Sequence, residues 1–215
     1  MEDLRQVFAR KYAENQLSEN QQKQKNLLIT GEMGAGQTII NNSSIVQMNL
    51  FKSDYLWSTF DMLQRRTHLS TWKKHTAKSV YRQGKSIIFG YLEDYRYLGT
   101  IWLRIVKKDC HIVHFMVDPD YQKEGIGSKL LKKAIAYAKE QGCQTMTLEV
   151  KADNFKARNL YRKFGFMVDF VKPQYYNSWS PQKYLGTIQN SIQPIQFNSK
   201  VSYKNTDAFH CIKYL

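Results

Sequence analysis

The sequence has no apolar run that approaches the roughly 20 residues needed for a membrane-spanning helix. Its first residues, MEDLRQVFARKY, include acids and lack the apolar core of a secretory signal. We therefore expect no membrane span, no export by a signal peptide and a cytoplasmic protein. Cysteine is also scarce. Cys110, Cys143 and Cys211 are widely spaced and form no C-x-x-C pair, so buried reduced thiols are expected rather than a metal or redox site.

A lysine is missing from the one stretch that looks like a nucleotide-binding loop. Residues 27–38, LLITGEMGAGQT, match the pattern G-x-x-x-x-G-K-[ST] except at Gln37, which stands in place of the lysine. Such a loop must open into a helix, whereas residues 41–44, NNSS, disfavour one. The later segments SIIFGYLE, YLGTIWLRIV and HIVHFMV read as successive strands, without the alternating helices of a nucleotide triphosphatase. We expect a flexible or strand-forming leader here, and phosphate-binding chemistry elsewhere.

Acidic residues are too few to balance the basic ones, and the formal net charge is +14. Charges of the two signs balance within residues 1–50, so the whole excess lies in 51–215. Such a surface attracts acidic partners, among them RNA, a ribosomal surface, anionic lipid or a polyanionic cofactor. Because the lysines are scattered and never form a run longer than two, an ordinary solvated face is an equally good interpretation.

Apolar spacing divides the chain into a leader and one domain. Residues 1–44 form a polar leader with an amphipathic helix near its start, and 45–215 form the domain. Two helices are predicted in DYLWSTFDML and STWKKHTAKSVY, the second capped by Ser70 or Thr71. The three strands come next. The last predicted elements are a helix over 128–141 stopped by Gly142, a strand TMTLEV, a helix over 154–164 closed by Gly165, and strands FMVDFV and DAFHCIKYL.

The segment VDPDYQKEGIGSKLL joins a buried strand to a helix through Gly125 and Gly127. Glycines let backbone amides come close to a ligand, and the amides at a helix N-terminus stabilise an anion by about 0.3–1 kcal/mol at a surface. A phosphate group is therefore expected to bind at this junction.

Two motifs carry a resemblance to a known family. Q-x-x-G-x-G after V-D-P resembles the acetyl-coenzyme A signature of the GNAT acyltransferase superfamily, whose order of elements is similar to that of residues 45–215. LEVKADNFKARNLYRKFGF resembles LEVR-x-x-N-x-x-A-x-x-LY-x-x-x-GF of the RimI-type N-terminal acetyltransferases, which modify the first residue of a ribosomal protein. Tyr175, Tyr176 and the final strand are similar to the R-x-x-YY and DA-x-x-M ending of that family. The resemblance implies an α/β (α+β) fold: a mixed sheet of about six to seven strands, flanking helices and a splayed cofactor slot.

The resemblance also implies which residues hold acetyl-coenzyme A. Backbone groups of Phe115, Met116 and Val117 would pair with the pantetheine arm like an added strand. Asn154 would touch the cofactor, although it is equally placed to cap a helix. The pyrophosphate would be wrapped by the turn and the first residues of the helix: Gln122, Lys123, Glu124, Gly125, Ile126, Gly127 and Ser128.

Glu149 matches the general base of the family, and Tyr161, twelve residues later, its general acid. An α-amine with a pKa of about 7.7–8.0 must lose a proton before it can attack, and the departing thiolate needs one. Glu149 could instead pair with a lysine such as Lys151, and Tyr161 could be a core aromatic residue. His111 and His114 alternate badly with a single cleft and are expected to be structural.

Three features depart from the family pattern. Residues 177–206 form an insertion of about thirty residues beside the expected acceptor slot, where the family has a short turn. Lys172 and Pro173 stand where the family tends to carry arginines, and the leader has no counterpart. The acceptor therefore stays open: a protein N-terminus, or a lysine, a small amine or an aminoacyl-tRNA. The intact Glu149 and Tyr161 argue against a third reading, a non-catalytic module that binds RNA or a protein.

Overall fold

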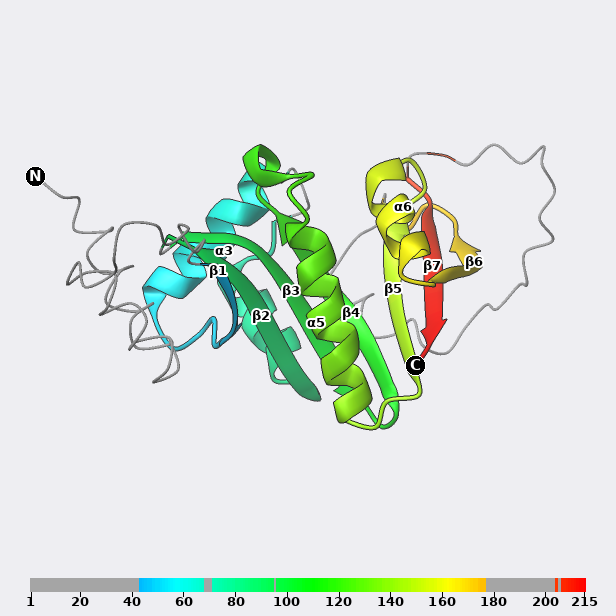
Figure 1. Ribbon diagram of the computed structural model, residues 1–215, viewed down its shortest axis with the longest axis horizontal. Helices are drawn as coiled ribbons and strands as arrows, with labels where there is room; N and C mark the ends of the chain where they lie inside the picture. The colour runs from blue at the N-terminus through cyan, green and yellow to red at the C-terminus, as the bar shows by residue number, and fades with distance from the viewer. Residues whose placement is uncertain (1–42, 68–70, 95, 177–203, 205) are drawn as a thin grey trace, which may run out of the picture.

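Apolar and β-branched segments of the chain form a seven-stranded sheet in the computed structural model, which describes residues 43–67, 71–94, 96–176, 204 and 206–215 (Figure 1). The strand order is β1-β2-β3-β4-β5-β7-β6. Among the strands that the structure describes, β4 and β5 pair in parallel and every other neighbouring pair is antiparallel. The strands are β1 (Ser43–Met48), β2 (Lys85–Glu93), β3 (Arg96–Val106), β4 (Asp109–Val117), β5 (Thr145–Lys151), β6 (Met167–Lys172) and β7 (Ala208–Tyr214).

Helices cover both faces of the sheet. On one face, α5 (Ile126–Glu140) packs on β2, β3 and β4, and α6 (Phe155–Lys163) lies at the end of β5 and β7 (Figure 1). On the other face, α3 (Asp54–Arg66) and α4 (Lys74–Tyr81) cover the half formed by β1 to β4. Alternation along β2 separates the two cores, because Ile87 and Phe89 face α5 whereas Ile88 faces α3.

The start of α4 differs from the prediction. Thr71 lies outside the helix, which begins at Lys74 after Lys73, and Ser70 lies outside the described residues. The backbone N–H of Trp72 donates to Oε1 of Gln64 in α3 at 2.8 Å, and both residues are buried. This bond ties the chain to α3 before the helix can begin.

The other helix boundaries follow the predicted residues closely. α5 starts at Ile126, two residues before the predicted start, because Gly125 serves as its N-cap. Asn154 caps α6, its Oδ1 accepting from the N–H of Ala157 at 3.1 Å. Gly142 and Gly165 both have positive φ, +73° and +81°, which confirms them as helix stops.

A bulge in β4 decides which side chains face which core. The β3–β4 register shifts so that Trp102 pairs with His114 and Leu103 with Ile112, leaving Val113 without a partner. Ile112 belongs to the α5 core, whereas His114 belongs to the opposite face. The bulge therefore turns His111 and His114 to the same side of the sheet, although their spacing predicts opposite sides.

Residues 1–42 of the predicted 1–44 leader, and residues 177–203 and 205 of the insertion, lie outside the described residues, so the domain boundaries stay predictions. From Ser43 onward the segment after the glycine-rich stretch is strand β1, not a helix. Within the described ranges no helix is long and apolar enough to cross a membrane.

Candidate active site

The parallel pair β4–β5 opens toward the carboxyl ends of both strands. Its last paired residues are Ile112 and Leu148. Beyond them β4 continues to Val117 against β3 alone, and β5 continues to Lys151 against β7 alone. Among the described strands, none pairs with the backbone on the inner edges of the opening, which matches the predicted splayed slot and leaves room for an extended ligand.

Along the β4 edge of this opening, the backbone N–H and C=O groups of successive residues point alternately toward β3 and into the opening. The N–H of Asp118 donates to the carbonyl of Leu98 in β3 at 2.8 Å. By the alternation of an antiparallel ladder, Met116 also directs its backbone groups to β3, whereas Phe115 and Val117 direct theirs into the opening. Of the three residues predicted to pair with an added strand, Phe115 and Val117 are the ones that face it.

The turn after β4 leads the chain into the N-terminus of α5. It contains a short 3-10 helix, Pro119–Tyr121, and two residues with positive φ, Lys123 at +74° and Gly125 at +83°. The side-chain Nε2 of Gln122 donates to the carbonyl of Val117 at 3.3 Å. These contacts bring the turn back to the end of β4 and leave the first amides of α5 without partners inside the helix, as at any helix N-terminus.

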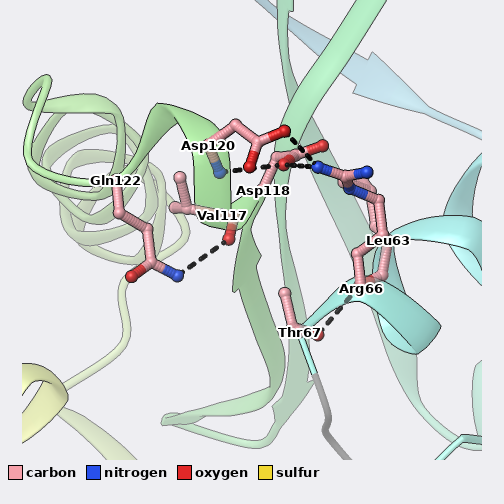
Figure 2. A network of polar contacts seen from close by, with 7 residues as sticks. All are labelled: Leu63, Arg66, Thr67, Val117, Asp118, Asp120 and Gln122. Carbon is pink, nitrogen blue, oxygen red and sulfur yellow. Dashed lines mark hydrogen bonds and ion pairs between the residues drawn. The ribbon is translucent and has the colours of Figure 1, made fainter.

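An arginine that the sequence analysis did not single out holds this turn (Figure 2). Nη2 of Arg66, in the last turn of α3, donates to Oδ1 of Asp118 at 2.9 Å and also to Oδ2 of Asp120. The same Asp118 oxygen accepts from the backbone N–H of Asp120 at 3.1 Å. Arg66 thereby ties α3 to the turn before α5. In the sequence, the position of Arg66 near the end of a helix is the one feature that could have indicated this contact.

Glu149 lies on β5 at the opening, on the face opposite Leu148 and the α5 core. Its side chain is only 10% exposed, yet it contacts two basic side chains, with Oε1 2.6 Å from Nζ of Lys172 and Oε2 3.1 Å from Nε2 of His111. Burial would raise the pKa of Glu149, but the charges and hydrogen bonds of His111 and Lys172 outweigh it and hold the pKa well below the usual range. Glu149 is therefore ionised, and its lysine partner is Lys172, not the Lys151 considered from the sequence.

Tyr161 lies on α6 inside the main core. Its ring centroid is 6.2 Å from that of Phe115 on β4 and 5.8 Å from that of Phe166. Burial, with smaller effects of Tyr176 and Cys211, raises the pKa of Tyr161 well above its usual range, so the phenol keeps its proton. Tyr161 approaches the opening from the α6 side, whereas Glu149 faces the other side of the sheet.

The tyrosine pair after β6 lies close to Glu149. The Tyr175 and Tyr176 rings are in edge contact at 5.1 Å, and Nζ of Lys172 stands 5.3 Å from the Tyr175 ring. Burial and the negative charge of Glu149 raise the pKa values of both phenols. The pair thus forms an uncharged, aromatic border beside the carboxylate.

The two histidines of β4 have different roles. His111 contacts Glu149 and Thr147 and so lies beside the predicted base, a position that the sequence analysis did not foresee. His114 lies in the second core, with its ring 5.3 Å from Phe60 and 5.9 Å from Trp72. Its Nδ1 has no hydrogen-bond partner in the described structure, so its polar atoms are not all satisfied.

We expect His114 to make the protein less stable in acid. Burial lowers its pKa to about 4, whereas an unfolded histidine titrates near 6.5, so below pH 6.5 the unfolded state binds more protons. From pH 7 to pH 5 this should remove about 2 kcal/mol of unfolding free energy. In urea titrations His114→Phe should lose that dependence and the exposed control His75→Gln should keep it. Equal dependence in His114→Phe and the parent would contradict this.

The chain belongs to the acetyltransferase (GNAT) family, whose profile matches residues 53–166. It is 30% identical over 115 residues to the [ribosomal protein bS18]-alanine N-acetyltransferase of Escherichia coli, a match over 53% of this chain and 76% of that protein. These findings confirm the predicted family and N-acetyltransferase activity.

Solved structures confirm the fold. The crystal structure of the ribosomal-protein-S18-alanine N-acetyltransferase from Escherichia coli superposes with a TM-score of 0.60 at 21% identity, over 79% of this chain and 92% of that one. A GNAT family acetyltransferase from Elizabethkingia anophelis with acetyl-CoA bound gives a TM-score of 0.59 at 18% identity, over 82% of this chain and 100% of that one.

Proposed function

We propose that this acetyltransferase moves the acetyl group of acetyl-coenzyme A to the α-amine of a protein N-terminus. The observation that carries the proposal is the β4–β5 opening, which has the α5 N-terminus at one end and the ionised Glu149 on its border. The relative that acts on alanine of ribosomal protein bS18 supports a protein N-terminus as the acceptor, and a net charge of +14 suits an acceptor beside RNA. The three cysteines are buried free thiols, in keeping with a cytoplasmic enzyme.

In this proposal the cofactor lies along β4 and ends on α5. The backbone groups of Phe115 and Val117 bind the pantetheine arm, with Met116 between them supporting the strand. Asn154 borders the cofactor while its side chain caps α6. The pyrophosphate binds the amides of the turn and the first turn of α5, that is Gln122, Lys123, Glu124, Gly125, Ile126, Gly127 and Ser128.

The proposed chemistry has two proton transfers. Glu149, directly or through water, takes a proton from the acceptor ammonium, and the freed amine attacks the thioester carbonyl. Tyr161, whose raised pKa keeps the phenol protonated, gives a proton to the departing thiolate.

Mass spectrometry of two peptide pools tests which kind of amine is the acceptor. One pool has free α-amines and no lysine, and the other has blocked α-amines and internal lysines. After incubation with acetyl-coenzyme A we expect acetylation of the first pool alone. Modification of the second pool alone would assign lysine acetylation instead. If neither pool changes while acetyl-coenzyme A still raises the melting temperature, the acceptor is not a simple peptide.

Replacing Gly125 should weaken cofactor binding selectively. Its φ of +83° is strained for any residue with a Cβ, although a Cβ there would meet nothing within 4 Å. Gly125→Ala should shift the first amides of α5 and raise the Kd of acetyl-coenzyme A about tenfold, measured by calorimetry. Gly142→Ala at the other end of α5 is a matched control, since its φ is +73° and its surroundings are equally open. Equal Kd values for the two variants would remove the α5 N-terminus from the cofactor site.

A further inference from the structure

The turn between β4 and α5 has little core packing of its own. From Pro119 to Gly125 no side chain is buried, and Tyr121 alone is half-buried. Lys123 has a φ of +74°, a conformation that residues with a Cβ disfavour. Apolar burial therefore does little to fix the shape of this turn, and its polar contacts have to do so.

Several of these contacts are made within the turn or with the strand before it. The backbone N–H of Tyr121 donates to the carbonyl of Asp118 at 3.0 Å, and that of Asp120 donates to Oδ1 of Asp118 at 3.1 Å. Nε2 of Gln122 reaches back to the carbonyl of Val117. These bonds shape the turn and tie it to the end of β4, but none of them joins it to another helix.

Arg66 makes that connection, from a helix on the opposite face of the sheet to α5 (Figure 2). Its Nη2 donates to Oδ1 of Asp118 at 2.9 Å and to Oδ2 of Asp120, so that one nitrogen bridges two residues of the turn. The side chain of Asp118 is 10% exposed and that of Arg66 41%. A charge-assisted hydrogen bond to a carboxylate so shielded from water is stronger than one at an open surface.

Arg66 extends from a helix end that is fixed in the core between α3 and the sheet. Leu63, one turn before Arg66, is fully buried. Its carbonyl accepts from the backbone N–H of Thr67 at 3.0 Å and from Oγ1 of Thr67 at 2.9 Å. Because the end of α3 is held in this way, the guanidinium fixes the turn with respect to the sheet.

We infer that Arg66 is a positioning residue for the binding of acetyl-coenzyme A, and that it acts through Asp118 and the turn before α5. The inference rests on the proposed function, which places the pyrophosphate on the amides of this turn and of the first turn of α5. Several amides bind one anion together only when the backbone holds them in a single arrangement. The contacts of Arg66 hold that arrangement before the cofactor arrives, so that less ordering is needed on binding.

A direct effect of the charge of Arg66 on the cofactor is the alternative, and it predicts a different result at Asp118. Removal of the positive charge of Arg66 would weaken the binding of a polyanion in either case. If charge alone mattered, removal of the negative charge of Asp118 would strengthen binding. If Arg66 acts through the turn, the same removal weakens binding, because the bond from Arg66 loses its charged acceptor.

Calorimetry of acetyl-coenzyme A binding separates the two effects. Arg66→Gln should raise the Kd about tenfold, and Asp118→Asn about fivefold, since the contact of Arg66 with Asp120 remains. The double variant should stay within about twofold of Arg66→Gln, because both substitutions remove the same contact. With saturating cofactor, kcat of Arg66→Gln should stay within about twofold of the parent.

Arg65→Gln is the matched control. Arg65 is the neighbouring residue on α3 and has the same charge, but it is 70% exposed and its Nε donates to Asp61 of the same helix at 2.9 Å. This variant should bind acetyl-coenzyme A as the parent does. Amide hydrogen exchange of the cofactor-free protein gives a second measurement: the amides of Asp120 and Tyr121 should exchange at least about fivefold faster in Arg66→Gln and at the parent rate in Arg65→Gln.

The outcomes distinguish this inference from the proposed function. A parent protein that does not bind acetyl-coenzyme A would end the cofactor site of the proposed function. A parent that binds it while Arg66→Gln keeps the same Kd would overturn the inference alone. Binding by Asp118→Asn as tight as the parent or tighter, or an Arg65→Gln loss as large as that of Arg66→Gln, would overturn it too. So would unchanged amide exchange of the turn in Arg66→Gln.

Discussion

Glu149→Gln is expected to lower kcat for acetyl transfer about 10²- to 10⁴-fold. The substitution keeps the shape of the side chain and a partner for Lys172 at 2.6 Å, but it removes the negative charge from a site that is 10% exposed. The acceptor ammonium would then have no carboxylate to take its proton. Steady-state rates with an N-terminal peptide, together with calorimetry of acetyl-coenzyme A, measure the effect.

The Kd of acetyl-coenzyme A should stay within about twofold of the parent, since Glu149 lies outside the turn before α5. Glu140→Gln, at the exposed end of α5, is the control for loss of a carboxylate elsewhere and should keep the parent rate. A Glu149→Gln enzyme as fast as the parent would remove Glu149 from the reaction.

Phe60→Ala should cost about 3–5 kcal/mol of unfolding free energy. Phe60 is fully buried on α3, with its ring 6.2 Å from Trp102 of β3 and 5.3 Å from His114 of β4. Removing it leaves a cavity between α3 and the sheet, in a domain whose total stability is about 5–15 kcal/mol. Urea unfolding at pH 7, followed by tryptophan fluorescence, measures the loss.

Met62→Ala on the same helix provides the comparison. Its side chain is 49% exposed, so the expected change is within about 0.5 kcal/mol. Phe60→Leu refills most of the cavity and should cost under about 1.5 kcal/mol. Equal unfolding free energies for Phe60→Ala and Met62→Ala would show that α3 contributes little to the stability of the sheet.

Much of the fold could be predicted from local sequence patterns. The apolar segment SIIFGYLE was predicted to be a strand, and the structure confirms it as β2, whose Ile87 and Ile88 lie in different cores. Gly142 and Gly165 end helices because positive φ costs glycine little. The start of α4 was predicted too early because the bond from Trp72 to Gln64 ties the segment before α4 to α3, and the pattern of a single helix carries no sign of such a bond.

The sequence predicted only those residues of the candidate site that lie in a recognised motif. The turn at Gly125 and the carboxylate of Glu149 follow from their motifs, and the structure places both at the β4–β5 opening. His111 and Lys172 do not belong to either of these motifs. His111 was discounted because simple alternation misplaced it, and the bulge at Val113 is a property of the pairing with β3.

The sequence by itself determined the strand and helix pattern of the domain, because that pattern depends on neighbours within one element. The proposed phosphate-binding junction before α5 and the proposed roles of Glu149 and Tyr161 came from motifs that resemble those of a known family. Only the tertiary structure decided that Glu149 is held between Lys172 and His111, and that Arg66 binds the turn through Asp118. The physical reason is that both depend on charges brought together from separate strands and helices, where strand order and register fix the distances. Burial of these groups then sets their protonation, and no window of sequence contains that information.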